Sequence, residues 1–243
     1  MAGTKRKKKQ KSGVRKKSKK SKSSKNKAIG PSFVSMNQVQ GELKFIDVEQ
    51  ANQNIAFSGT VASDFLTVPQ GTTESERTGR KIWIKSIYIR GYLLLDNDAE
   101  AITNNNAGND YVRVCIVRDK VANGSQATYA QVFGAATDND LNSLKFRSLN
   151  RTKRFDILYE KWFRVGNLVA GYDGTAGTTY YRIGGRTLVE IYLNNLNIPI
   201  SYGGATGAVS ERLDHNVFMV MSDSNDQSDL GWSGLTRMRY VDG

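Results

Sequence analysis

RKIWIKSIYIRGYLLL, residues 80–95, is the stretch that decides the fold. Apolar side chains alternate with polar ones along it, which is the period of a β-strand with one buried face. The alternation changes phase in mid-run, from even positions such as Ile84 to odd positions such as Ile87. A change of phase inside a continuous strand predicts a β-bulge near Lys85–Ser86, which would bend the strand.

Seven other segments are also rich in β-branched and aromatic residues, and polar turns separate them. In DYVRVCIVRD, residues 110–119, Val112, Val114 and Ile116 share one face. In FDILYEKWFRV, residues 155–165, the odd-numbered apolar residues are expected to share one face. The eight expected strands are Glu42–Glu49, Ile55–Val68, Lys81–Leu95, Tyr111–Arg118, Phe155–Val165, Thr179–Leu193, His215–Ser222 and Leu235–Val241.

Eight strands with few helices predict an all-β fold of two packed sheets, a sandwich or a jelly roll. The longest connection runs between Asp119 and Arg154, and ATYAQVFGA inside it is expected to form a short helix. The sequence lacks a run of 18 apolar residues and an apolar N-terminal stretch, so we expect no membrane insertion and no signal peptide. Cys115 is the only cysteine, so the fold does not depend on an intrachain disulfide.

Charge is distributed very unevenly along the chain. Residues 1–27 contain fourteen Lys or Arg and no acidic residue, out of 35 basic and 23 acidic residues in all. The remainder has 21 basic residues (35 − 14) against 23 acidic ones, a net charge of −2. The fourteen are Lys5, Arg6, Lys7, Lys8, Lys9, Lys11, Arg15, Lys16, Lys17, Lys19, Lys20, Lys22, Lys25 and Lys27. We expect residues 1–27 to be a disordered polybasic arm, 28–40 a hinge and 41–243 the folded domain.

A polycation without a fixed shape suits a phosphate backbone, which it binds by counterion release without reading sequence. Nucleic acid is therefore the expected partner of the arm. Basic runs also serve as nuclear localisation signals, and Lys5–Lys9 with Arg15–Lys20 fit that second role. The alternative without a binding function is a tail that is simply solvated. An anionic membrane is a weaker candidate, because no hydrophobic anchor adjoins the arm.

A second basic cluster lies within the folded part, in KFRSLNRTKR. It has no acidic residue, and Phe146 is able to stack on a base while the cations pair with phosphates. The alternative is a charged loop at a boundary between subunits. The five basic residues of this candidate nucleic-acid site are Lys145, Arg147, Arg151, Lys153 and Arg154.

Catalytic and metal-binding patterns are nearly absent, so we expect neither an enzyme nor a cofactor. His215 is the only histidine, and we expect it to be structural rather than a general base. Cys115 is expected to be a buried structural thiol. The glycines of RIGGRT, residues 182–187, lack the spacing of a phosphate-binding loop. No metal site is predicted, although acidic loops are possible Ca²⁺ ligands; they contain Asp96, Asp98, Glu100, Asp138, Asp140, Asp223, Asp226 and Asp229.

The three tryptophans are candidates for core or subunit-contact anchors. They are Trp83, Trp162 and Trp232. Trp162 lies on the parity of Asp156 and Glu160, opposite the main apolar face of its strand. We therefore expect it to pack under a loop or a neighbouring subunit rather than between the sheets.

This layout resembles the capsid proteins of small circular single-stranded DNA viruses that encode a replication-initiator protein, the geminivirus-like and circovirus-like groups. It is also similar to the coat protein of satellite tobacco necrosis virus. VCIVRDKVANGSQATYAQVFG (114–134) and RTKRFDILYEKWFRV (151–165) carry the strongest likeness, and GRKIWIKSIYIRG, NVFMVMSDS and LTRMRYVDG follow in the same order. The sequence departs from the plant geminivirus pattern because it lacks a Cys/His-rich motif.

The resemblance implies an eight-stranded viral jelly roll with sheets BIDG and CHEF and with the expected strands as B to I. It implies a capsid protein that assembles with itself into a T=1 shell of 60 copies. The basic arm would bind single-stranded genomic DNA, with RNA not excluded, and would direct import into the host nucleus through an import receptor. The expected location is the virion, and the host nucleus during assembly. The alternative is a cellular nucleic-acid-binding β-sandwich protein with a basic tail.

Overall fold

A computed structural model describes residues 41–95, 110–122, 124–134, 144–148, 151–165, 168–173, 179–183, 185–224 and 230–243. The expected arm (1–27) and hinge (28–40) lie outside the described residues. The strands are β1 (Leu43–Asn54), β2 (Thr60–Val61), β3 (Lys81–Leu95), β4 (Asp110–Asp119), β5 (Phe155–Val165), β6 (Leu168–Asp173), β7 (Thr179–Ile183), β8 (Arg186–Leu193), β9 (Ile198–Ser201), β10 (Asn216–Asp223) and β11 (Leu230–Asp242). Helix α1 spans Tyr129–Phe133, and a 3₁₀ turn spans Val209–Glu211.

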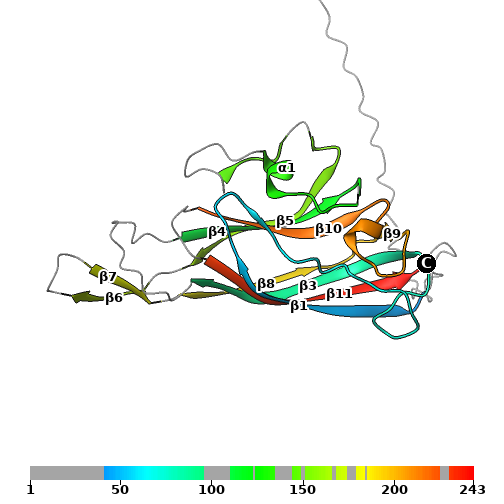
Figure 1. The fold of residues 1–243 in the computed structure, drawn as a ribbon, viewed down its shortest axis with the longest axis horizontal. Coiled ribbons are helices and arrows are strands. Elements are labelled where there is room, and N and C mark those ends of the chain that lie inside the picture. Colours follow the sequence, from blue (N-terminus) through cyan, green and yellow to red (C-terminus); the bar gives the residue numbers. More distant parts are fainter. Residues whose placement is uncertain are drawn as a thin grey trace, which may run out of the picture. The chain divides into compact units, whose positions relative to one another are not determined.

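The strands form two antiparallel sheets stacked face to face (Figure 1). One sheet has the order β1-β11-β3-β8, with β9 also paired to β3, and the other has the order β2-β10-β4-β5. When these eight strands are lettered B to I in chain order, the sheets read BIDG and CHEF, so the predicted jelly roll is confirmed. Two elements are additional to this frame: the β6–β7 hairpin between strands F and G, and β9 between strands G and H.

Several details of the strands agree with the sequence pattern. The bounds of β3 and β5 are those predicted. The bulge in β3 is confirmed, because Arg239 pairs with Ser86 and Tyr240 with Ile84, which leaves Lys85 as the extra residue. The short helix within ATYAQVFGA is also confirmed. Its N-cap is Thr128, which forms a capping box with Gln131.

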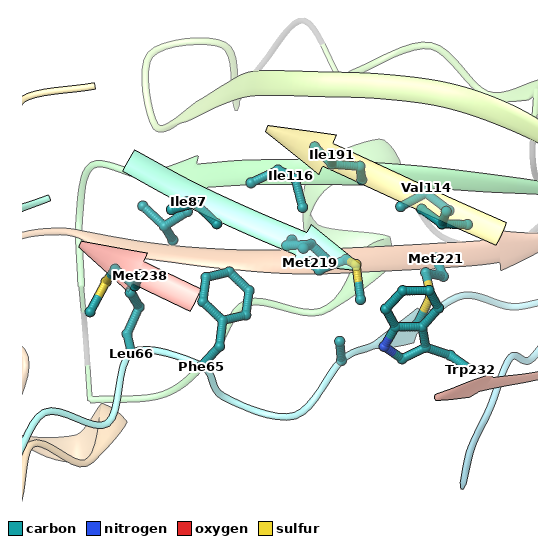
Figure 2. Close-up of a cluster of buried hydrophobic side chains, with 14 of the residues drawn as sticks. Phe65, Leu66, Ile87, Val114, Ile116, Ile191, Met219, Met221, Trp232 and Met238 are labelled. Atoms are coloured by element: carbon teal, nitrogen blue, oxygen red, sulfur yellow. The ribbon is translucent and has the colours of Figure 1, made fainter. Parts of the chain in front are cut away.

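Two predicted strands do not form the single paired strands that were expected. Only Thr60–Val61 of the expected strand Ile55–Val68 pairs with a neighbour. The apolar residues of this segment instead fill the space between the sheets, where Phe65 and Leu66 point into the core (Figure 2). The expected strand Thr179–Leu193 is two strands, β7 and β8, which pair with different partners. Two consecutive glycines separate them in the sequence, and glycine weakens a strand interior.

The faces of β5 also differ from the prediction. Ile116 of β4 pairs with Tyr159 but Val117 pairs with Ile157, so the register shifts within the strand. As a result Phe163 lies in the core between the sheets, whereas Phe155 packs on the other side of the CHEF sheet. The odd-numbered residues of β5 therefore do not share one face.

The inner faces of both sheets form one apolar core. Trp232 is completely buried there, and its indole Nε1 donates a hydrogen bond of 3.0 Å to Oε1 of Gln50. Figure 2 shows Trp232 beside Met221 and across from Val114, which brings β11, β10 and β4 together. Trp232 is thus the core anchor among the three tryptophans.

We expect Trp232→Ala to lower the free energy of unfolding by about 3–5 kcal/mol, because it removes a large buried ring and leaves a cavity. Circular dichroism during urea unfolding of the full chain measures this. Leu213→Ala, at a side chain with 63 % exposure, is the matched control and should change stability by less than about 0.5 kcal/mol. Equal losses for both variants would contradict the assignment of Trp232 to the core.

Candidate nucleic-acid interface

The basic cluster of the folded domain lies beside α1, on the outer side of the CHEF sheet. Its arginines bind acceptors of their own chain. Nη1 of Arg147 donates to the carbonyl of Phe155 at 3.0 Å, and Nη1 of Arg151 donates to the carbonyl of Gln131 at 2.7 Å. Arg154 forms a bidentate ion pair with Asp119, with N–O distances of 2.9 and 2.7 Å. These contacts fasten the segment to the sheet and neutralise one of its cations.

Other members of the cluster face water. Lys153 is exposed, and no ion pair to it is found in the described part of the chain. Lys145 is half-buried. The side chain of Phe146 has 92 % exposure, the largest of any large apolar residue described. The structure thus places the five predicted basic residues on one segment but gives them different surroundings.

Arg113 holds this outer layer together, although no sequence pattern marked it as a structural residue. Its guanidinium has only 3 % exposure, yet it lies on the outer face of β4. It pairs with Glu160 of β5 through Nε at 2.9 Å, and it donates to the carbonyl of Lys145 at 2.5 Å. It also lies 3.9 Å from the ring centroid of Phe133 in α1. One buried cation therefore joins two strands, the helix and the basic segment.

Two neighbours of Arg113 were predicted from the sequence. Cys115 is buried in the cluster between α1 and the CHEF sheet, and burial raises the pKa of its thiol to about 12. The predicted structural thiol is confirmed.

Trp162 pairs across the ladder with Arg113, has 40 % exposure and lies outside the core between the sheets, as expected. Trp83 is half-buried on β3, with Nζ of Lys81 4.9 Å from its ring centroid.

Two other buried arginines fix the loops at one end of the sandwich. Arg77 is fully buried, and its Nε donates to the carbonyl of Val68 at 3.1 Å while the guanidinium lies 4.4 Å from the ring centroid of Tyr202. Arg212 forms an ion pair with Asp64 and donates to Oδ1 of Asn216 at 2.6 Å. These contacts join the loop before β3 to the loop before β10, so both loops present a fixed surface.

No metal centre is found in the described residues. No group of three or more His, Cys, Asp or Glu side chains there is placed to hold a metal ion. Of the predicted acidic loop residues, only Asp223 is described, and it is fully buried on β10. No helix in the described residues is long and apolar enough to cross a membrane.

His215 lies just before β10 and is half-buried, with Nδ1 3.7 Å from Oδ1 of Asp214. Burial lowers its pKa below the usual 6.5, and the positive charge of Arg118 lowers it further. The unfolded chain therefore takes up a proton more readily than the folded domain. The free energy of unfolding must fall as the pH falls through 6.5.

We expect this pH dependence to be measurable as a decline in stability between about pH 7.5 and 5.5, where histidine is the titrating side chain. His215→Gln removes the group and should flatten the decline. Urea unfolding at each pH gives the free energies for both proteins. An unchanged slope in the variant would show that His215 does not carry the dependence.

The comparisons with known proteins agree with this architecture. Residues 3–228 match the model of the geminivirus coat protein/nuclear export factor BR1 family. The matched span runs from the basic arm through β10. No individual curated protein matches the chain significantly. The missing Cys/His-rich motif does not prevent the match, which covers most of the chain, and the chain belongs to the geminivirus coat protein family.

Proposed function

We propose that this viral capsid protein assembles with itself into a T=1 shell of 60 copies and packages single-stranded genomic DNA through its basic arm. The observation that carries the proposal is the segregation of charge. Fourteen basic residues lie within residues 1–27, while the rest of the chain has a net charge of −2. A nearly neutral domain can pack against copies of itself, while the arm neutralises phosphates.

The single jelly roll supports the proposal of a small shell. Between β1 and β11 the additions to the eight-stranded frame are short, and none is long enough to form a second, protruding domain. Sixty copies would bring about 840 arm charges, enough for a genome on the order of a thousand nucleotides by charge matching alone. The phosphate contacts of Lys and Arg do not distinguish DNA from RNA, so RNA binds the isolated protein as well.

The arm is also proposed to direct import into the host nucleus, because Lys5–Lys9 and Arg15–Lys20 are two basic runs of the kind that import receptors bind. For the basic segment at Lys145–Arg154 we propose the role of a subunit boundary. Its arginines are engaged within the chain, and Arg154 is already neutralised by Asp119. The family match favours a capsid protein over a cellular β-sandwich protein.

Deletion of residues 1–27 tests the role of the arm. We expect the truncated protein to remain folded and to form shells or pentamers that have lost nearly all bound nucleic acid, because the fourteen cations are gone. The ratio of nucleic-acid to protein absorbance of purified particles, with mass measurement, gives both results. Full-length protein is the control and should have a particle mass of 60 subunits plus genome. Packaging by the truncated protein at the full-length level would leave nuclear import as the role of the arm.

Trp162→Ala tests the outer face of the CHEF sheet as a contact between subunits. The ring is partly exposed beside Arg113, so its removal should leave the domain folded while shells become weaker. Thermal unfolding and the salt concentration at which particles dissociate are compared with those of the natural protein. If the variant forms normal particles but unfolds at a much lower temperature, Trp162 stabilises the fold of the subunit and not a contact between subunits.

A further inference from the structure

The outer face of the BIDG sheet is unusually apolar for a surface that nothing described covers. Helix α1 lies over the CHEF sheet, whereas no described helix or strand lies over the outer face of β1, β11, β3 and β8 (Figure 1). A solvated sheet face is normally polar, and a contiguous apolar patch marks an interaction surface. Six of the twelve exposed large hydrophobic residues described lie here: Leu43, Phe45, Tyr92, Leu188, Tyr192 and Leu235.

The aromatic rings on this face are arranged by the strand register. Tyr88 of β3 is directly opposite Tyr192 of β8, and their ring centroids are 6.1 Å apart at an interplanar angle of 76°. Tyr92 lies further along β3 on the same face, opposite Leu188, and Arg90 stands between the two tyrosines of β3. A sheet that presents aromatic rings and arginines is a common platform on which single-stranded nucleic acid stacks its bases.

The charges of this face do not by themselves attract a polyanion strongly. Arg237 donates two hydrogen bonds to the carboxylate of Asp47, with N–O distances of 2.7 and 2.6 Å. Glu190 accepts a hydrogen bond from the hydroxyl of Tyr88. The remaining arginines, Arg90, Arg186 and Arg239, have no carboxylate partner in the described part of the chain, and Glu49 offsets one of them. The surface is thus suited to contact bases, with phosphate neutralisation supplied from elsewhere.

The basic residues of the arm are the expected source of that neutralisation, because all fourteen lie within residues 1–27 and no acidic residue lies among them. In the sequence, residues 1–40 precede β1, which is the edge strand of this same sheet. Leu43 and Phe45 are exposed at the start of β1. Because the arm and the domain belong to one chain, nucleic acid bound by the arm has a raised effective concentration for the domain.

We propose that the outer face of the BIDG sheet is a stacking platform for the bases of the packaged single strand, with Tyr92 and Tyr192 as its principal exposed rings. The arm neutralises phosphates and the sheet contacts bases. This proposal rests on the proposed function of the chain as a genome-packaging capsid protein.

The test compares three variants of the full chain: Tyr92→Leu with Tyr192→Leu, Tyr92→Phe with Tyr192→Phe, and Tyr111→Leu. Leucine keeps the apolar area but removes the ring, whereas phenylalanine keeps the ring. Tyr111 has 45 % exposure, close to the 47 % of Tyr92, but belongs to the CHEF sheet and is the matched control. The probes are fluorescent oligo(dT) and an abasic deoxyribose-phosphate oligomer of the same length.

We expect the double Leu variant to bind oligo(dT) about tenfold or more weakly, because each lost base–ring stack weakens binding severalfold. The slope of affinity against salt should not change, since the same phosphates are neutralised. The double Phe variant and Tyr111→Leu should bind as the natural protein does, and the abasic oligomer should bind all four proteins alike. Fluorescence anisotropy at several salt concentrations measures these affinities, and circular dichroism verifies folding.

Two results would overturn the proposal. One is equal affinity of the natural protein for oligo(dT) and the abasic oligomer. The other is a double Leu variant that keeps its affinity for oligo(dT); if that variant also fails to form particles, the face is a contact between copies. Failure of the arm deletion to reduce packaging would contradict the proposed function instead, because that result does not depend on the tyrosines.

Discussion

The apolar inner faces of two sheets must meet in one dry layer, and the rest of the structure depends on this constraint. A strand exchanges its faces when its register slips by one residue, so burial on one side fixes the pairing of each strand. The chain satisfies the constraint with two irregularities. Lys85 is an extra residue in β3, and the register of β5 shifts between Ile157 and Tyr159. Each irregularity changes which side chains reach the core without ending the strand.

The outer faces of the two sheets differ in what covers them. On the CHEF sheet, the register shift in β5 turns Phe155 outward into a cluster that Phe133 of α1 also joins, and Arg113 is buried against the ring of Phe133. A buried guanidinium is costly to desolvate unless its donors find acceptors, and the carboxylate of Glu160 and the carbonyl of Lys145 meet that need. The BIDG sheet has no such described layer. Among the described residues, the CHEF sheet therefore has a covered outer face and the BIDG sheet has an uncovered, aromatic one.

Local periodicity was sufficient to predict the bounds of two long strands. β3 and β5 were placed to the residue, and the phase change at Lys85 was visible because isoleucines mark both parities. Periodicity was not sufficient where apolar residues fill the core without belonging to a hydrogen-bonded strand, as Phe65 and Leu66 do. The register shift in β5 escaped prediction because Phe155 and Phe163 are equally apolar and bury themselves in different clusters. Arg113 escaped because Glu160 is 47 residues distant, and no local pattern reports such a pairing.

The folded domain and the arm differ in how their charges are balanced. Within the folded domain, several cations have fixed partners: Lys44 pairs with Asp242, Arg113 with Glu160, and Arg154 with Asp119. Neutral domains do not repel one another when they pack closely. The arm has no acidic residue of its own, so arms gathered within a proposed shell repel one another until a polyanion neutralises them. In the proposed shell, nucleic acid that neutralises the arms therefore lowers the free-energy cost of bringing the domains of the full chain together.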